Sequence, residues 1–377
     1  MIIAGETSGD HHGAKVVEAI RRRDDSLCFC GIGGEALRAA GTEILADAST
    51  LSVVGITEVF SKISDILRGM KIAKHALRTV RPDLLILIDF PDFNLLLAGT
   101  AKRLGIPVLY YISPQVWAWR SGRVTKIAKL VDHMAVILPF EAAFYRKHKV
   151  PVTFVGHPLG EIGENRNLKP GTRNSEFPLV GLLPGSRNSE IAKLLPVMLE
   201  AAQVMLSQRG DIKFLISLAP SVSEEIVKDI LSRFSLPASH FSFVTGPEEI
   251  FGRCSFAIAA SGTVTLQTAM AGVPMVVIYK VSPLSYLVGR AMIKVAHICL
   301  VNLIAGKEIV PELIQDEASP ENISRLALNI LNDADRLEKM RNELLGIRKM
   351  LGGPGASEQV ADIAINMLQR ILGNYKI

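Results

Sequence analysis

Cysteine is scarce in this chain, and its positions lack the spacing of a metal site. Cys28 and Cys30 stand two residues apart on an expected strand and face the same side, whereas Cys254 and Cys299 are isolated. A structural zinc site takes its ligands from closely spaced pairs, and the sequence has no such pairs. The four thiols are therefore expected to be reduced and mostly buried, and neither a metal nor a cofactor is predicted.

Other absences limit the class of protein. The first residues run directly into a strand and a Gly-rich turn, so the basic and apolar regions of a secretory signal are missing and an intracellular protein is expected. Charged residues make up 21% and hydrophobic residues 49%, which is typical of a globular protein without a long disordered tract. A chain of 377 residues exceeds the size of one hydrophobic core, which predicts two domains.

An excess of acidic charge is also missing. The net charge of +5 instead favours an anionic partner. This partner could be a nucleotide, a phosphorylated lipid, a membrane surface or a nucleic acid, and the net charge does not distinguish among them. The sequence motifs are needed for that.

A long uncharged run, residues 254–279, is not expected to span a membrane. Its length would allow a transmembrane helix, but polar residues occupy its middle and Gly272-Val273-Pro274 would break the helix. The pattern instead predicts one buried βαβ unit with a strand at 256–260, a turn at Ser261-Gly262-Thr263, a helix at 264–271 and a strand at 275–279.

Short apolar strands alternate with helical stretches through both halves of the chain, which is the βαβ rhythm of parallel sheets. We expect strands at residues 1–4, 27–30, 84–88, 108–112, 134–138 and 152–155, and then at 179–183, 214–218, 241–244, 256–260 and 275–279. A polar stretch rich in Gly, Pro and Asn, residues 160–178, is the expected linker. The predicted fold is thus two doubly wound α/β domains, whose ligands bind at the carboxyl ends of the strands.

Two loops of the first half present polar groups directly after strands. "GETSGD" opens a helix, where amides and the helix dipole can hold an anion or a hydroxyl-rich ligand; a tight turn capped by Ser8 or Asp10 is the alternative. "LLILIDFPDFN" places Asp89 at the end of a strand and Asp92 shortly after it. A carboxylate there can take a proton from an attacking hydroxyl, and the alternative is that Asp89 caps a helix while Asp92 is solvated.

The segment "YYISPQVWAWR" concentrates both tryptophans of the chain just after a strand. Aromatic rings at the mouth of a cleft suit stacking on a sugar or contact with acyl chains. The alternative for Trp117 and Trp119 is the domain core. His157 ends the last expected strand of the first half, where a hinge role is favoured over catalysis.

In the second half, "VGLLPGSRNSEIAKLL" repeats the order of strand, turn and helix. Gly185 permits the turn, and Arg187 offers a planar fork to phosphate, with a merely exposed Arg187 as the alternative. The turn Ser261-Gly262-Thr263 opens a second helix that can face the same diphosphate. Gln267 lies about one helical turn beyond it and can reach a ribose.

Seven motifs together resemble the bacterial lipid-A-disaccharide synthase family over essentially the whole chain: "GETSGD", "DFPDFN", "SPQVWAWR", "VGHPL", "LLPGSR", "ASGTVTLQTAMAGVPMVV" and "NLIAGKEIVPELIQ". The resemblance implies a GT-B glycosyltransferase fold of two Rossmann-like domains, 1–165 for the acceptor and 166–377 for the UDP-sugar, with the last helix either on its own domain or crossing back. It implies an inverting, metal-independent transfer from UDP-2,3-diacylglucosamine to the 6-hydroxyl of 2,3-diacylglucosamine 1-phosphate. The expected products are a β-1,6-linked disaccharide and UDP.

The resemblance also assigns roles by motif position. Asp89 becomes the catalytic base, with Asp92 as the next candidate. The acceptor side is expected to include Gly5, Ser8, Gly9, Asp10, Gln115 and Trp117. The expected UDP contacts are Gly185, Ser186, Arg187, Ser261, Gly262, Thr263, Gln267 and Asn302. The family pattern usually has Glu at the position of Gln267, so a retained site with somewhat looser UDP binding is predicted.

Both implied substrates carry acyl chains, so the enzyme is expected to be cytoplasmic and peripheral on the inner membrane. Residues 59–81 predict a basic amphipathic helix that can lie in an anionic interface. A solvated helix packed on its own sheet is the alternative. No nucleic-acid partner is expected, and a homodimer is left open.

Three other interpretations compete with this one. A UDP-sugar 2-epimerase would turn over UDP-diacylglucosamine without an acceptor. A glycosyltransferase with an undecaprenyl-linked acceptor shares the architecture, but "SPQVWAWR" and "DFPDFN" favour the lipid A interpretation. A non-enzymatic UDP-binding or lipid-binding module would leave two carboxylates at the sheet edge without a purpose.

Overall fold

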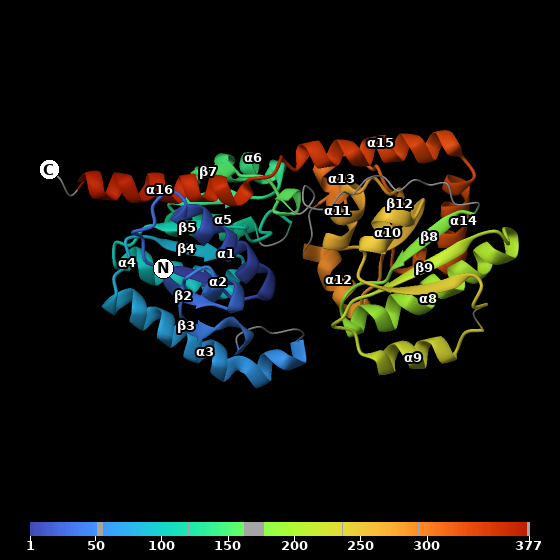
Figure 1. The fold of residues 1–377 in the computed structure, drawn as a ribbon, viewed down its shortest axis with the longest axis horizontal. Helices are drawn as coiled ribbons and strands as arrows, with labels where there is room; N and C mark the ends of the chain where they lie inside the picture. Colours follow the sequence, from blue (N-terminus) through green and yellow to red (C-terminus); the bar gives the residue numbers. More distant parts are fainter. Residues whose placement is uncertain (51–55, 119–120, 162–176, 236, 293–294, 375–377) are drawn as a thin grey trace. The chain divides into compact units, whose positions relative to one another are not determined.

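A computed structural model describes the chain except for residues 51–55, 119–120, 162–176, 236, 293–294 and 375–377. The chain divides into two units, which are described separately (Figure 1). Unit 1 comprises Met1–Ile162 and Leu351–Ile377, and unit 2 comprises Gly163–Met350. The last helix therefore lies with unit 1, the second of the two expected arrangements. The expected domain boundary at 165/166 and most of the expected linker lie outside the described residues.

Unit 1 contains a parallel seven-stranded sheet of order β3-β2-β1-β4-β5-β6-β7. Its strands are β1 (Ile2–Ala4), β2 (Cys30–Gly33), β3 (Glu43–Asp47), β4 (Leu85–Ile88), β5 (Val108–Tyr111), β6 (His133–Val136) and β7 (Val152–Phe154). The order along the sheet reverses between β1 and β4. In doubly wound sheets, a ligand crevice lies at such a switch point, beyond the carboxyl ends of the two strands.

Helices cover both faces of this sheet. They are α1 (Thr7–Arg21), α2 (Glu35–Ala39), α3 (Ile56–Thr79), α4 (Pro91–Arg103), α5 (Val124–Leu130), α6 (Pro139–Lys147) and α16 (Ala356–Asn374). One core cluster joins α3, α4, α5 and α6 to the sheet. The other joins α1 and α16 to the opposite face. Apolar strands buried on both sides, as β4 is, follow from this double cover.

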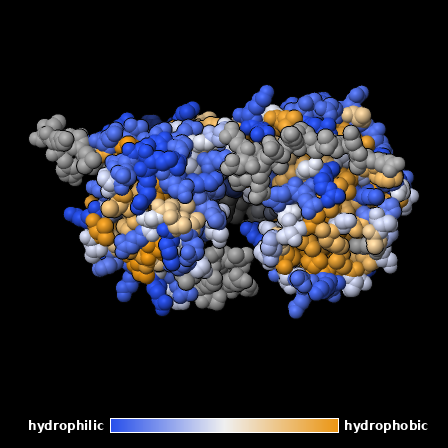
Figure 2. All heavy atoms as spheres, viewed as in Figure 1, coloured by the Kyte–Doolittle hydropathy of each residue, from blue (hydrophilic) through white to orange (hydrophobic). Residues whose placement is uncertain are grey.

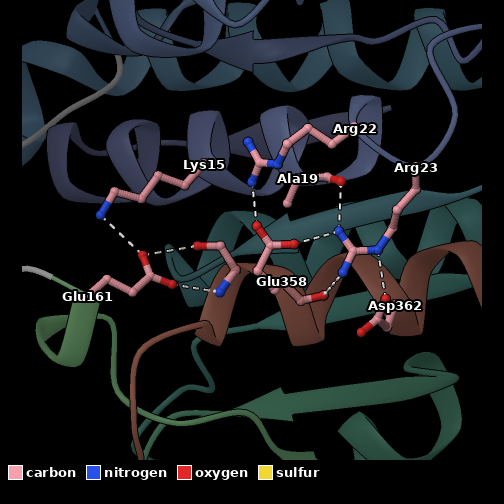
Figure 3. A network of polar contacts seen from close by, with 8 residues as sticks. Lys15, Ala19, Arg22, Arg23, Glu161, Glu358 and Asp362 are labelled. Carbon is pink, nitrogen blue, oxygen red and sulfur yellow. Dashed lines mark hydrogen bonds and ion pairs between the residues drawn. The ribbon is translucent and has the colours of Figure 1, made fainter. Parts of the chain in front are cut away.

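Ion pairs join the carboxyl-terminal end of α1 to α16, although the two helices lie near opposite ends of the sequence (Figure 3). Arg23 pairs with Glu358 at 2.6 Å and with Asp362 at 2.7 Å, and Arg22 also pairs with Glu358. At the start of α16, Glu161 accepts hydrogen bonds from Lys15 and from the backbone N–H of Ser357. These contacts, together with the apolar residues of α16, attach the carboxyl-terminal helix to unit 1.

Unit 2 contains a parallel six-stranded sheet of order β10-β9-β8-β11-β12-β13, with the same reversal, here between β8 and β11. Its strands are β8 (Leu179–Leu183), β9 (Lys213–Leu218), β10 (Phe241–Thr245), β11 (Phe256–Ala260), β12 (Met275–Tyr279) and β13 (Glu312–Ile314). Its helices are α8 (Asn188–Gln208), α9 (Glu224–Ser232), α10 (Glu248–Arg253), α11 (Thr263–Met270), α12 (Pro283–Met292), α13 (Leu300–Ala305), α14 (Pro320–Leu331) and α15 (Ala334–Met350).

The uncharged run is the βαβ unit that its pattern predicted, formed by β11, α11 and β12. Both strands are buried almost throughout, because each lies between two other strands and under helices. Among the helices of the described residues, none combines the length and the apolar character that a bilayer crossing requires.

The second strand was predicted wrongly at residues 27–30, because β2 begins only at Cys30. A Cβ at Gly31 would overlap the carbonyl group of Ile2 on the neighbouring strand, so glycine allows the close approach here. The shift leaves Cys28 exposed and Cys30 half-buried, which corrects the expectation for these two thiols. Cys254 and Cys299 are buried as expected.

Candidate functional site

A pocket of about 440 Å³ lies at the carboxyl ends of the strands in unit 2. Gly185, Ser186 and Arg187 line it after β8, and Ser261, Gly262 and Thr263 line it after β11. These two strands are neighbours at the switch point of the sheet. Gln267, on the first turns of α11, completes the wall. The structure thus brings together in one pocket every residue predicted for UDP except Asn302.

Two helix N-termini open into this pocket. α8 begins directly after Arg187, and α11 begins at Thr263. The first N–H groups of a helix have no partner within it, and the helix dipole adds partial positive charge at that end. Arg187 contributes a full positive charge, and 66% of its side chain is exposed. The pocket is therefore suited to a doubly anionic group such as a diphosphate.

Glu190 is a residue of this pocket that the sequence analysis missed. Its carboxylate accepts hydrogen bonds from the backbone N–H groups of Ser186 and Arg187, at 3.1 and 3.4 Å, and one from Nη1 of Arg187 at 3.2 Å. The sequence does contain a signal for this residue: Glu190 stands three residues after Arg187, the N-cap residue of α8, and a Glu at that position can form a capping box.

Asn302 does not line the pocket, which corrects its expected role as a UDP contact. Its side chain is fully buried at 0% exposure. Its amide nitrogen donates to the carbonyl oxygen of Val310 and to Glu312, while its oxygen accepts from the N–H groups of Ile309 and Val310. All four hydrogen bonds of the amide are formed within the protein, so Asn302 instead holds α13 to the segment before β13.

In unit 1, Asp89 follows β4 at the switch point of the sheet. Asp89 and Phe90 both have positive φ, 45° and 46°, a conformation that Asp tolerates better than most residues. The carbonyl oxygen of Asp89 accepts hydrogen bonds from Asn94 Nδ2 at 2.6 Å and from the Tyr110 hydroxyl at 2.7 Å. Gly5 lies against Phe90, because a Cβ there would overlap the ring. Gly5, a member of the expected acceptor side, therefore lies beside the residue that follows Asp89.

The environment of Asp89 is that of a proton acceptor. Burial, and then the negative charge of Glu6, raise the pKa of Asp89 to about 6. A carboxylate with such a pKa is a stronger base than an ordinary one and is still ionised at neutral pH. Sequence analysis missed Glu6, since its proximity depends on β1 and β4 being neighbours.

Asp92 lies in a different environment, on the first turn of α4. Its side chain is 76% exposed and pairs with Arg123 at 2.8 Å. The two carboxylates of "DFPDFN" are therefore not equivalent. Asp89 is largely buried, whereas Asp92 is solvated. A solvated Asp92 was the alternative given in the sequence analysis.

The "GETSGD" loop contains one exposed and three buried members of the predicted acceptor set, the buried ones including Gly5. Ser8 is exposed on the first turn of α1, and Gly9 is buried against Ala4 and Ile88. Asp10 is also buried, and its carboxylate accepts hydrogen bonds from the backbone N–H groups of Gly34, Ala36 and Leu37. These contacts make Asp10 the cap of α2, which corrects its expected place among the acceptor contacts.

In the aromatic segment, Gln115 is exposed and Trp117 is half-buried, while Trp119 lies outside the described residues. Trp117 packs edge-on against Phe140, and its Nε1 donates to Glu141 at 2.9 Å. Glu141 is 1% exposed and also accepts from the Ser113 hydroxyl, and burial raises its pKa. This buried carboxylate, which sequence analysis missed, organises the segment.

Comparison with known proteins identifies the family. A model of the lipid-A-disaccharide synthetase family matches residues 1–362. The chain belongs to this family. A lipid-A-disaccharide synthase of Geobacter sulfurreducens is 48% identical, with 98% of this chain and 97% of the relative covered. One of Syntrophus aciditrophicus is 46% identical, with 98% of each chain covered.

Solved structures show the fold of this family member. An S. aureus MnaA–UDP co-structure matches with a TM-score of 0.65 and 11% identity, covering 99% of this chain and 96% of the other. The structure of Acinetobacter baumannii MurG matches with a TM-score of 0.56 and 14% identity, covering 96% and 97%. The predicted GT-B fold of two Rossmann-like units is confirmed, and the chain is a glycosyltransferase by family.

Proposed function

We propose that the chain transfers 2,3-diacylglucosamine from UDP-2,3-diacylglucosamine to the 6-hydroxyl of 2,3-diacylglucosamine 1-phosphate, releasing UDP. The observation that carries the proposal is the pocket of unit 2, which joins both predicted diphosphate loops at one switch point. The family supports the same activity, since the relatives above carry the name lipid-A-disaccharide synthase.

In this proposal, the pocket of unit 2 holds UDP. Cleavage of the bond between sugar and diphosphate leaves negative charge on the phosphate oxygens. Arg187 and the N-termini of α8 and α11 are oriented toward the position of that charge, so they stabilise it without reorganisation. Gln267 is assigned to the ribose, through its carbonyl oxygen and its amide group.

Asp89 is proposed as the base. It removes the proton of the acceptor 6-hydroxyl while that oxygen attacks the anomeric carbon from the face opposite UDP, which inverts the configuration. Its raised pKa and its position near Glu6, the residue directly before α1, support this role. Ser8, Gln115 and Trp117 are the exposed or half-exposed residues that we assign to the acceptor sugar.

The test is UDP release measured with each substrate alone and with both together. UDP release only from the mixture supports the transferase. Turnover of UDP-diacylglucosamine without acceptor would instead support an epimerase, and no UDP release from the mixture would refute the transferase. Replacing Asp89 by Asn should abolish turnover while UDP binding remains, and near-normal turnover would move the role of base to Asp92.

We also propose that the protein is peripheral on an anionic membrane surface through α3. Leu67 is 64% exposed there, beside the exposed Arg68 and Lys71, and Figure 2 shows apolar residues among hydrophilic ones in this part of unit 1. Further along α3, Met70 and Ala73 are buried in the core, so this part packs on its own sheet. The side chains of Phe60 and Ile63 lie outside the described residues.

Flotation with phosphatidylglycerol vesicles at low salt tests the membrane proposal. Protein that stays with the soluble fraction would refute it. The homodimer stays a prediction, which sedimentation velocity can test.

A further inference from the structure

The anion position at the start of α8 is occupied by a carboxylate of the chain itself. Glu190 lies on the first turn of α8, and its Oε2 accepts hydrogen bonds from the N–H groups of Ser186 and Arg187 at 3.1 and 3.4 Å. Its Oε1 accepts from Nη1 of Arg187 at 3.2 Å. These are the donors that the proposed function assigns to the diphosphate of UDP, so ligand and side chain need the same groups.

The backbone is shaped to admit this carboxylate. Gly185 has a φ of 110°, and a Cβ at this position would overlap Oε2 of Glu190. The turn therefore requires glycine both for its conformation and for the space that the carboxylate fills. The contact is open to solvent, since 66% of the Arg187 side chain and 34% of the Glu190 side chain are exposed. An ion pair this exposed is weak and can exchange its anion.

A bound diphosphate would bring further negative charge to the same donors. Two carboxylates, Glu190 and Glu248, line the pocket together with Arg187. Glu190 also acts on Tyr279 at the end of β12: burial, and then the negative charge of Glu190, raise the pKa of the Tyr279 hydroxyl. Like charges at short distance repel even in this partly exposed site, so a diphosphate at these donors disfavours the present position of the Glu190 carboxylate.

We propose that Glu190 is a resident competitor of UDP. Its carboxylate satisfies the diphosphate donors in the empty pocket, swings away when the UDP-sugar binds, and returns as UDP leaves. This inference rests on the proposed UDP site. Its consequence is that Glu190 weakens UDP binding and accelerates the release of UDP, since affinity within one site is tuned mainly through dissociation.

The experiment is isothermal titration of the full chain and of Glu190→Gln with UDP, inorganic pyrophosphate and uridine. Glutamine keeps an acceptor oxygen for the N–H groups but removes the negative charge. UDP and pyrophosphate should bind at least about fivefold more tightly to the variant, while uridine affinity stays unchanged. Stopped-flow displacement should show slower UDP release from the variant, and circular dichroism checks that it is folded.

Glu248→Gln is the matched control, because it removes the same charge from the same pocket but not from these donors. Equal tightening in both variants would overturn the inference in favour of general electrostatics, and so would unchanged or weaker UDP binding by Glu190→Gln. Glu190→Asp provides a second variant, whose shorter side chain should withdraw from the donors and also tighten UDP binding. If the wild-type chain bound no UDP at all, the proposed function itself would fail, which is a distinguishable result.

Discussion

Removal of the proposed base should stabilise unit 1 in a pH-dependent way. Burial and Glu6 raise the pKa of Asp89 from 3.8 to about 6, so the folded state disfavours the ionised carboxylate. For a group whose folded pKa is raised, stability is fully present below the unfolded pKa and is lost as pH rises through the folded pKa. The cost of ionised Asp89 is therefore about 3 kcal/mol at pH 8 and falls to about 1 kcal/mol at pH 4.5.

Asp89→Asn removes this cost without new strain. Asn tolerates the positive φ at this position as well as Asp does, and its side-chain oxygen can still accept a hydrogen bond from the N–H of Phe90. We expect the free energy of unfolding to rise by up to about 3 kcal/mol at pH 8, with a gain of about 1 kcal/mol at pH 4.5. The variant should be more stable and inactive, a trade typical of active-site residues.

Urea denaturation followed by tryptophan fluorescence measures this effect, because both tryptophans of the chain, Trp117 and Trp119, lie in unit 1. Asp92→Asn is the control: its side chain is 76% exposed and paired with Arg123, so no comparable gain is expected. A gain of equal size at both pH values, or no gain at all, would refute the reasoning that Asp89 carries a raised pKa.

Three further predictions concern the donor pocket and acid stability. Gln267→Glu should tighten UDP binding severalfold, because a carboxylate accepts hydrogen bonds from both ribose hydroxyls; weaker binding in a titration calorimeter would contradict the ribose assignment. Arg187→Lys should weaken UDP binding by about tenfold with little change in melting temperature, since the side chain is 66% exposed and the planar fork is lost; unchanged affinity would remove Arg187 from the diphosphate site. Burial lowers the pKa of His157 to about 4, so the folded state keeps it neutral and loses stability as pH falls from about 6.5 to 4, by up to about 3 kcal/mol. His157→Asn keeps an acceptor for the N–H of Leu159 and should reduce this acid sensitivity, and an identical decline of unfolding free energy in wild type and variant would disprove it.

Local patterns of the sequence determined the elements and the loops of this protein. Alternation of buried strands and amphipathic helices is a short-range property, so β8, β11 and β12 have the bounds that we expected. The same patterns placed the polar loops after strands, and most predicted donor residues accordingly line one pocket. β3 was missed because Glu43–Asp47 begins and ends with an acidic residue, which weakens the apolar signal of a strand. β13 was missed because Glu312–Ile314 spans only three residues and also begins with an acidic one.

Tertiary structure decided which polar side chains are available to a ligand. Asn302 and Asp10 look like binding residues in sequence, yet each is buried with its hydrogen bonds formed inside the fold. Sequence analysis did not single out Glu6 or Glu190, yet the charge of Glu6 raises the pKa of Asp89 and Glu190 accepts hydrogen bonds from the proposed diphosphate donors. The physical reason is that a motif specifies residue types along the chain, whereas sheet order and packing determine which partners each polar group meets.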